Sequence, residues 1–68
     1  MDYMQRLKQI RQKRKVSQEK ISEILEIPRT QYTRYETGFN EMPLRYFAKT
    51  CQFLNTSADY ILGLKDEE

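Results

Sequence analysis

Polar side chains with hydrogen-bonding groups cluster on one short segment near the middle of the chain. Within residues 29–36, Tyr32 and Tyr35 lie three positions apart, which is the spacing of the inner face of a helix. The outward positions of this segment and of the residue after it are all polar: Arg29, Thr30, Gln31, Thr33, Arg34 and Thr37. Arginine can donate two hydrogen bonds to guanine O6 and N7, and threonine can offer a hydroxyl or a methyl group to a base edge. Any solvated surface helix is also polar on its outer face. This segment alone is therefore consistent with a helix that reads DNA bases and with an ordinary surface helix.

A second short helix is predicted just before this segment, over residues 18–25. Ser17 is a good N-cap, because its side chain can accept hydrogen bonds from the free backbone amides at a helix start. Pro28 favours extended geometry at the residue before it, which places a turn at residues 26–28. Two short helices joined by a three-residue turn have the spacing of a helix-turn-helix. The second helix of such a motif fits the major groove of DNA.

Three further helices are predicted from the spacing of the apolar residues. Apolar residues three apart indicate a helix over about 3–14, another opens at Pro43 and continues to Leu54, and Ser57 can cap a short last helix. The sequence therefore predicts an all-α fold, a compact bundle of five short helices. The predicted core consists of Leu7, Ile21, Leu25, Tyr32, Leu44, Phe47, Leu54, Ile61 and Leu62, with Cys51 as a small buried hydrophobe.

The net charge of +2 conceals an asymmetry along the chain. Residues 5–20 carry seven basic side chains against one acidic one, whereas residues 59–68 carry four acidic side chains against one basic one. A basic segment suits a polyanion such as nucleic acid, and a solvated helix face is the alternative. The length predicts a single domain over residues 1–68, with a folded core at about 3–64 and an acidic tail at 65–68.

The residue inventory argues against several other classes of function. The chain has no histidine and a single cysteine, Cys51, so neither a disulfide framework nor a zinc site is expected. It has no glycine-rich phosphate loop and no metal-ligand cluster, so we expect no enzyme, no cofactor, no metal and no small-molecule ligand. No apolar run reaches the roughly 18 residues of a membrane span, and the N-terminus lacks an apolar signal core. We therefore expect neither membrane insertion nor export.

Ordered motifs run through nearly the whole chain: Arg6-Leu7, Arg11, Val16-Ser17-Gln18-Glu19, Ile27-Pro28-Arg29, Tyr32, Arg34-Tyr35-Glu36, Gly38, Met42-Pro43-Leu44-Arg45-Tyr46-Phe47 and Ser57-Ala58-Asp59-Tyr60-Ile61-Leu62-Gly63-Leu64. In this order the motifs resemble the lambda-repressor/Cro-like helix-turn-helix family, the xenobiotic-response-element type of transcriptional regulator. The resemblance implies double-stranded DNA as the partner and a location in the bacterial cytoplasm. It also implies a regulator, expected to be a repressor that binds a two-fold operator as a homodimer.

The resemblance assigns a role to each matching position. The residues expected to contact bases are Arg29, Thr30, Thr33 and Arg34. The residues expected to contact phosphates are Gln18, Gln31, Thr37 and Arg45. Arg11 and Glu36 match positions that form a salt bridge between the first helix and the end of the third. The candidates for a dimer surface are Phe53, Tyr60 and Leu64.

Two positions depart from the family pattern. Glu26 stands where the family usually has a glycine, so the turn is expected to be either mildly strained or differently shaped. Glu41 lies in a loop that is often basic in the family, where it would repel a phosphate, and Arg45 is the candidate to compensate. A second function stays open beside DNA binding. In that alternative the same fold is a protein-interaction module, such as a small antitoxin or a factor of a phage or mobile element.

Overall fold

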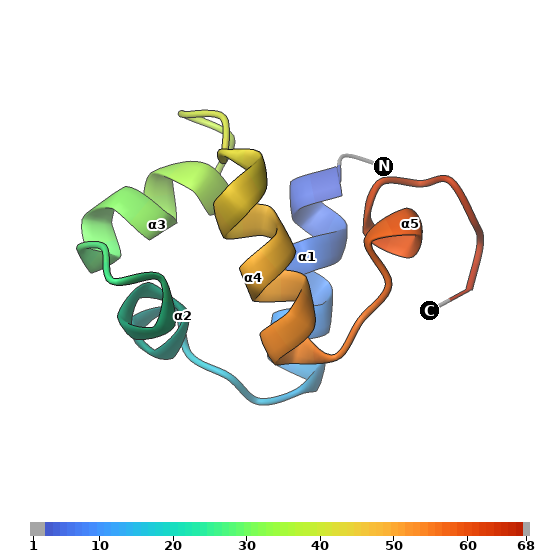
Figure 1. Ribbon diagram of the computed structural model, residues 1–68, viewed down its shortest axis with the longest axis horizontal. Helices are drawn as coiled ribbons and strands as arrows, with labels where there is room; N and C mark the ends of the chain where they lie inside the picture. The colour runs from blue at the N-terminus through green and yellow to red at the C-terminus, as the bar shows by residue number, and fades with distance from the viewer. Residues whose placement is uncertain (1–2, 68) are drawn as a thin grey trace.

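The computed structural model describes residues 3–67. Glu68, the last residue of the predicted acidic tail, lies outside this range. The helices are α1 (Tyr3–Lys13), α2 (Gln18–Leu25), α3 (Arg29–Glu36), α4 (Leu44–Leu54) and α5 (Ala58–Ile61), and the described residues contain no strand. The all-α prediction is therefore confirmed. Figure 1 shows α2 and α3 together at one end of the bundle, α1 and α4 across its middle, and α5 at the opposite end.

The turn between α2 and α3 keeps a left-handed residue even without glycine. Ser17 caps α2 as predicted, with its side chain accepting a hydrogen bond from the backbone N–H of Lys20. At the other end of α2, Glu26 has φ 58° and ψ 43°, which is the left-handed conformation. The backbone N–H of Ile27 then donates to the carbonyl of Ser22 at 3.1 Å, closing the end of the helix. The turn thus has the shape that a glycine would adopt, at the cost of strain at Glu26.

Replacing Glu26 with glycine is therefore expected to raise the free energy of unfolding by about 0.5–1 kcal/mol. The relief of left-handed strain, roughly 1–2 kcal/mol, exceeds the entropic cost of a glycine, roughly 0.5–1 kcal/mol. Asn55 is a matched control, because it also ends a helix in the left-handed region, with φ 55°, and asparagine tolerates that region. Asn55→Gly should give a smaller gain in urea unfolding. Destabilisation by Glu26→Gly would contradict the strain argument.

The core of the described part of the chain lies between helices α1 to α5 and is mostly aliphatic and aromatic. Its buried members are Met4, Leu7, Ile10, Ile21, Leu25, Tyr32, Tyr35, Met42, Phe47, Cys51, Leu54 and Ile61. Most of the predicted core residues are confirmed.

The prediction of burial is wrong for two residues: Leu44 is 78% exposed and Leu62 is 46% exposed. Leu44 is the first residue of α4, and helical side chains point toward the N-terminus, so it extends past the end of the core. Met42, in the preceding loop, is buried instead. Leu62 follows the single turn of α5, in which Ile61 occupies the core position.

Basic residues of α1 and of the turn that follows it hold the C-terminal helices in place. Nη1 of Arg6 donates to the carbonyl of Tyr60 at 2.8 Å, and its guanidinium lies 4.6 Å from the centre of the Tyr60 ring. Nε of Arg14 donates to the carbonyl of Leu54 at 3.0 Å, satisfying a carbonyl at the end of α4. Part of the basic N-terminal segment therefore stabilises the fold, and the charge count alone overstates the positive charge available to a polyanion. Within residues 3–67, no helix has the length and apolar character needed to cross a bilayer.

Candidate nucleic-acid interface

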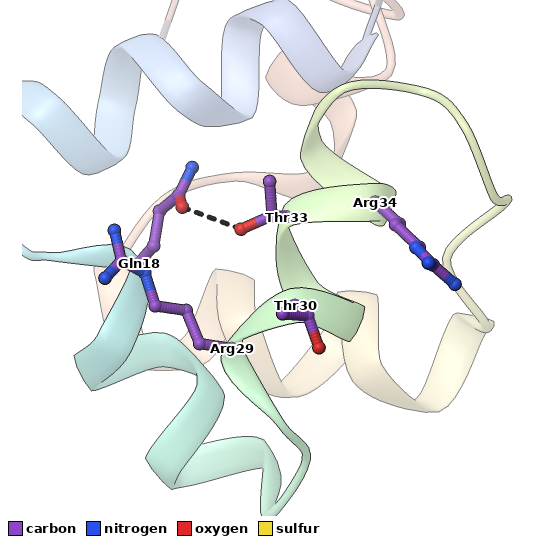
Figure 2. Close-up of a pocket in the computed structure, with 5 residues that line it drawn as sticks. All are labelled: Gln18, Arg29, Thr30, Thr33 and Arg34. Atoms are coloured by element: carbon purple, nitrogen blue, oxygen red, sulfur yellow. Dashed lines mark hydrogen bonds between the residues drawn. The ribbon is translucent and has the colours of Figure 1, made fainter.

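The outer face of α3 and the start of α2 together form an open depression of about 500 Å³. It is lined by Gln18, Arg29, Thr30, Thr33 and Arg34. Figure 2 shows Gln18 and Arg29 on one side of the depression, Arg34 on the other, and the two threonines between them. The structure thus brings together all four residues predicted to contact bases and the first predicted phosphate contact.

The start of α2 contributes backbone donors to the same surface. Gln18 is the first residue of α2, directly after the N-cap Ser17. The first amides of a helix have no partner within the helix, and the helix dipole favours negative charge there. A phosphate oxygen next to Gln18 would therefore meet both a side-chain amide and free backbone N–H groups.

A buried ion pair fixes α3 against α1. Nε and Nη2 of Arg11 donate to the two carboxylate oxygens of Glu36, each at 2.9 Å. The hydroxyl of Tyr32 donates to Oε2 of Glu36 at 2.6 Å, and Nε2 of Gln18 donates to Oε1 at 3.1 Å. The remaining Nη1 of Arg11 donates to the carbonyl of Val16 at 2.8 Å. The carboxylate therefore accepts four hydrogen bonds from two neighbouring helices and its own. The sequence did not suggest that Tyr32 takes part, although it lies one helical turn before Glu36.

Arg11, Gln18, Tyr32 and Glu36 form one hydrogen-bonded cluster, and its geometry determines the protonation states of the titratable members. Burial alone would raise the pKa of the Glu36 carboxyl, but the hydrogen bonds from Arg11, Tyr32 and Gln18 outweigh burial and lower it. The hydrogen bond to Glu36 raises the pKa of Arg11, against the opposing effect of burial. Burial and the hydrogen bond to Glu36 raise the pKa of the Tyr32 hydroxyl. Glu36 is therefore an ionised acceptor near neutral pH, and Arg11 and Tyr32 are donors.

The cluster extends to the surface through Gln18. The hydroxyl of Thr33 donates to Oε1 of Gln18 at 2.9 Å (Figure 2), and Gln18 in turn donates to Glu36. Both side chains are half-buried. The buried ion pair is thus linked by side-chain hydrogen bonds to two residues that line the depression.

Arg34 is oriented by a residue that the sequence analysis did not select. Its guanidinium lies 5.5 Å from the centre of the Phe39 ring, and Phe39 is 75% exposed. The backbone N–H of Asn40 donates to the carbonyl of Arg34 at 3.0 Å, which holds the loop after α3 close to the helix end. A cation over an aromatic face is stabilised by about 0.5–1 kcal/mol at exposed sites. The sequence signal for this contact was a phenylalanine directly after Gly38.

The other predicted phosphate contacts do not line the depression. Nε2 of Gln31 donates to the hydroxyl of Tyr35 at 2.8 Å, so this side chain is turned along α3. Thr37 is exposed and donates to the carbonyl of Arg34 at 3.4 Å. Arg45 is exposed on α4, with its guanidinium 4.5 Å from the centre of the Tyr46 ring. Glu41, in the loop before α4, is exposed as well. The phosphate roles of Gln31, Thr37 and Arg45 remain predictions.

The candidates for a dimer surface differ in exposure. Phe53 is 43% exposed and Leu64 is 73% exposed, whereas Tyr60 is half-buried beneath Arg6. Cys51 is buried, and burial raises the pKa of its thiol to about 11, so it is protonated near neutral pH. In the range 3–67, no three metal-ligating side chains come together.

The fold and this surface agree with the comparison of the sequence with known families. Residues 4–67 match the family described as "Helix-turn-helix domain". The chain therefore belongs to the helix-turn-helix domain family. It is also 35% identical over 65 residues to a protein of Bacillus subtilis (strain 168) described as "Uncharacterized HTH-type transcriptional regulator YobD". That match covers 96% of this chain and 58% of the relative, so the chain spans little more than half of the relative's length. No solved structure matches the chain.

Proposed function

We propose that this protein is a sequence-specific regulator of transcription that binds double-stranded DNA with α3 in the major groove. The observation that carries the proposal is the depression formed by Gln18, Arg29, Thr30, Thr33 and Arg34, in which donors and acceptors from two helices face outward together. Membership of the helix-turn-helix family and the similarity to an HTH-type transcriptional regulator support it.

The contacts divide into those that position the protein and those that select a sequence. Gln18 and the backbone amides at the start of α2 would bind a phosphate, which fixes the docking without selecting a base. Arg29, Thr30, Thr33 and Arg34 would contact base edges, since arginine recognises guanine bidentately and threonine can contact several bases. The buried pair of Arg11 and Glu36 would keep α3 in one orientation relative to α1 during binding.

We further propose a repressor that acts as a homodimer. Leu62 and Leu64 are exposed apolar residues that follow α5 in the sequence. Helix α5 lies at the end of the bundle opposite α2 and α3 (Figure 1). A second copy that packs on this end would leave both α3 helices free. Two-fold related α3 helices would then enter successive major grooves about 34 Å apart, and occupancy of a promoter would exclude polymerase.

The proposal is tested by selecting bound duplexes from a random pool and titrating salt against the most enriched sequence. A palindromic site with half-sites about one helical turn apart is the expected result, with an affinity that falls steeply as salt rises. Weak binding without sequence enrichment would overturn the proposal. The protein-interaction module would then be the remaining candidate function.

Replacing Arg34 with alanine is expected to weaken binding to the selected duplex by about 1–3 kcal/mol and to relax the preference at one base pair. Gln18→Ala should instead weaken binding to all duplexes alike, because a phosphate contact carries no sequence information. Lys65→Ala is the charge-matched control, since Lys65 is exposed beyond α5. Equal loss of preference in the Arg34 and Gln18 variants, measured by fluorescence anisotropy, would show that this division of contacts is wrong.

A further inference from the structure

The buried carboxylate of Glu36 determines which side chains of the depression donate hydrogen bonds and which accept them. Gln18 lies between Glu36, to which its Nε2 donates at 3.1 Å, and Thr33, from which its Oε1 accepts at 2.9 Å. Glu36 also accepts from Arg11 and Tyr32, so each hydrogen-bond partner of this carboxylate among residues 3–67 is a donor. The carboxamide of Gln18 therefore has one favourable orientation, with its nitrogen toward Glu36 and its oxygen toward Thr33.

This orientation decides what Thr33 can offer to a ligand. A threonine hydroxyl has one proton and two lone pairs. The proton of Thr33 is directed at Oε1 of Gln18, so the sides of Oγ1 that remain open carry only lone pairs. If the hydroxyl turned its proton toward the ligand, the oxygen of Gln18 would lose its donor, which is unfavourable for a half-buried polar atom.

The same network leaves Gln18 as a donor. A carboxamide nitrogen carries two protons, and only one of the Gln18 protons is directed at Glu36. The second proton remains for a phosphate oxygen. Thr33 has the opposite character, since an acceptor facing a phosphate oxygen is unfavourable. The two neighbouring side chains are thus suited to different parts of a duplex, Gln18 to the backbone and Thr33 to a base edge.

We propose that Thr33 acts toward DNA as a hydrogen-bond acceptor and selects a base that presents an amino group in the major groove, adenine N6 or cytosine N4. These amino groups are the donors of the major groove, whereas guanine O6, thymine O4 and the purine N7 atoms are acceptors. The inference rests on the proposed function. It goes beyond that function by assigning the hydroxyl of Thr33, one of the predicted base contacts, the role of an acceptor imposed by Gln18 and Glu36.

The test uses the selected duplex, the intact protein and two variants of one position. Thr33→Val removes the hydroxyl while keeping the shape of the side chain, and Thr33→Ser keeps the hydroxyl. In each half-site, adenine is replaced in turn by purine, which lacks the N6 amino group, and cytosine by 2-pyrimidinone, which lacks the N4 amino group. Circular dichroism melting establishes that both variants are folded.

At one position of the half-site, loss of the amino group is expected to weaken binding of the original protein and of Thr33→Ser by about 2- to 12-fold, the range for one hydrogen bond. The Thr33→Val variant should bind the unmodified duplex more weakly by a similar factor and should be insensitive to the same replacement. Effects of the analogues on base pairing alone would appear equally in all three proteins, so only the difference between proteins measures the contact.

The outcomes separate this inference from the function on which it rests. Enrichment of a duplex with equal sensitivity of all three proteins at every position would overturn the acceptor role of Thr33 and leave DNA binding intact. Failure to enrich any duplex would overturn the proposed function and this inference together.

Discussion

Replacing Glu36 with alanine is expected to destabilise the protein by about 3–5 kcal/mol, because it leaves the guanidinium of Arg11 buried without its counter-charge. The pair has little access to water, with side-chain exposures of 10% for Arg11 and 2% for Glu36. The substitution also removes the acceptor of the Tyr32 hydroxyl. A native domain is stable by only about 5–15 kcal/mol, and a chain of 68 residues is expected at the lower end. We therefore expect most of the stability to be lost in urea unfolding followed by circular dichroism.

Two control variants separate charge burial from the loss of any carboxylate. Glu23→Ala removes an exposed carboxylate from α2 and should change the stability by less than about 0.5 kcal/mol. Arg11→Met combined with Glu36→Leu replaces both charges by apolar groups and should recover much of the loss, because no charge is then left unpaired. A cost below about 1 kcal/mol for Glu36→Ala would contradict the assignment of this pair as a buried structural link.

The same pair predicts a loss of stability in acid. The pKa of Glu36 in the folded protein lies below its ordinary value of 4.5. A carboxyl with a lowered folded-state pKa contributes stability that is complete above the unfolded-state pKa and is lost as the pH falls through the folded-state pKa. The decline attributable to Glu36 should therefore begin near pH 5 and continue below pH 4.5. The Arg11→Met, Glu36→Leu variant should show a shallower decline over this window.

The second large effect is expected from two leucines at opposite ends of α4. Leu54 is 2% exposed and Leu44 is 78% exposed, although both follow the same apolar spacing. Leu54→Ala should lower the free energy of unfolding by about 2–5 kcal/mol, because it removes buried methyl groups and leaves a cavity. Leu44→Ala should change it by less than about 0.5 kcal/mol. Equal costs for the two substitutions in thermal or urea unfolding would show that Leu44 packs in the core after all.

The helices were predictable because their signals are local. Ser17 and Ser57 accept hydrogen bonds from amides three residues ahead, which depends only on the residues in one turn. Pro28 and Pro43 precede helices because the fixed φ of proline suits a helix start and its missing N–H is not needed there. The start of α1 and the bounds of α2 and α3 agree with the sequence, and α1 ends at Lys13, one residue before the predicted end.

Contacts between segments that are distant in the sequence were harder to predict. Arg6, Arg11 and Arg14 belong to one basic segment, yet each donates to a different part of the fold: Tyr60, Glu36 and Leu54. A count of charges cannot separate such residues from exposed lysines on the same helix, because the distinction depends on what packs against each face. Phe39 likewise became relevant only when the loop after α3 placed its ring near the guanidinium of Arg34.

The sequence by itself determined the helical class, the caps, and the set of polar residues on the outer face of α3. Each of these follows from interactions within one or two helical turns. The tertiary structure decided that Leu44 and Leu62 are exposed, and it decided that Gln18 connects Thr33 to the buried carboxylate of Glu36. Those outcomes depend on the space between helices and on hydrogen bonds across α1, α2 and α3, where side chains from different elements compete for the same positions.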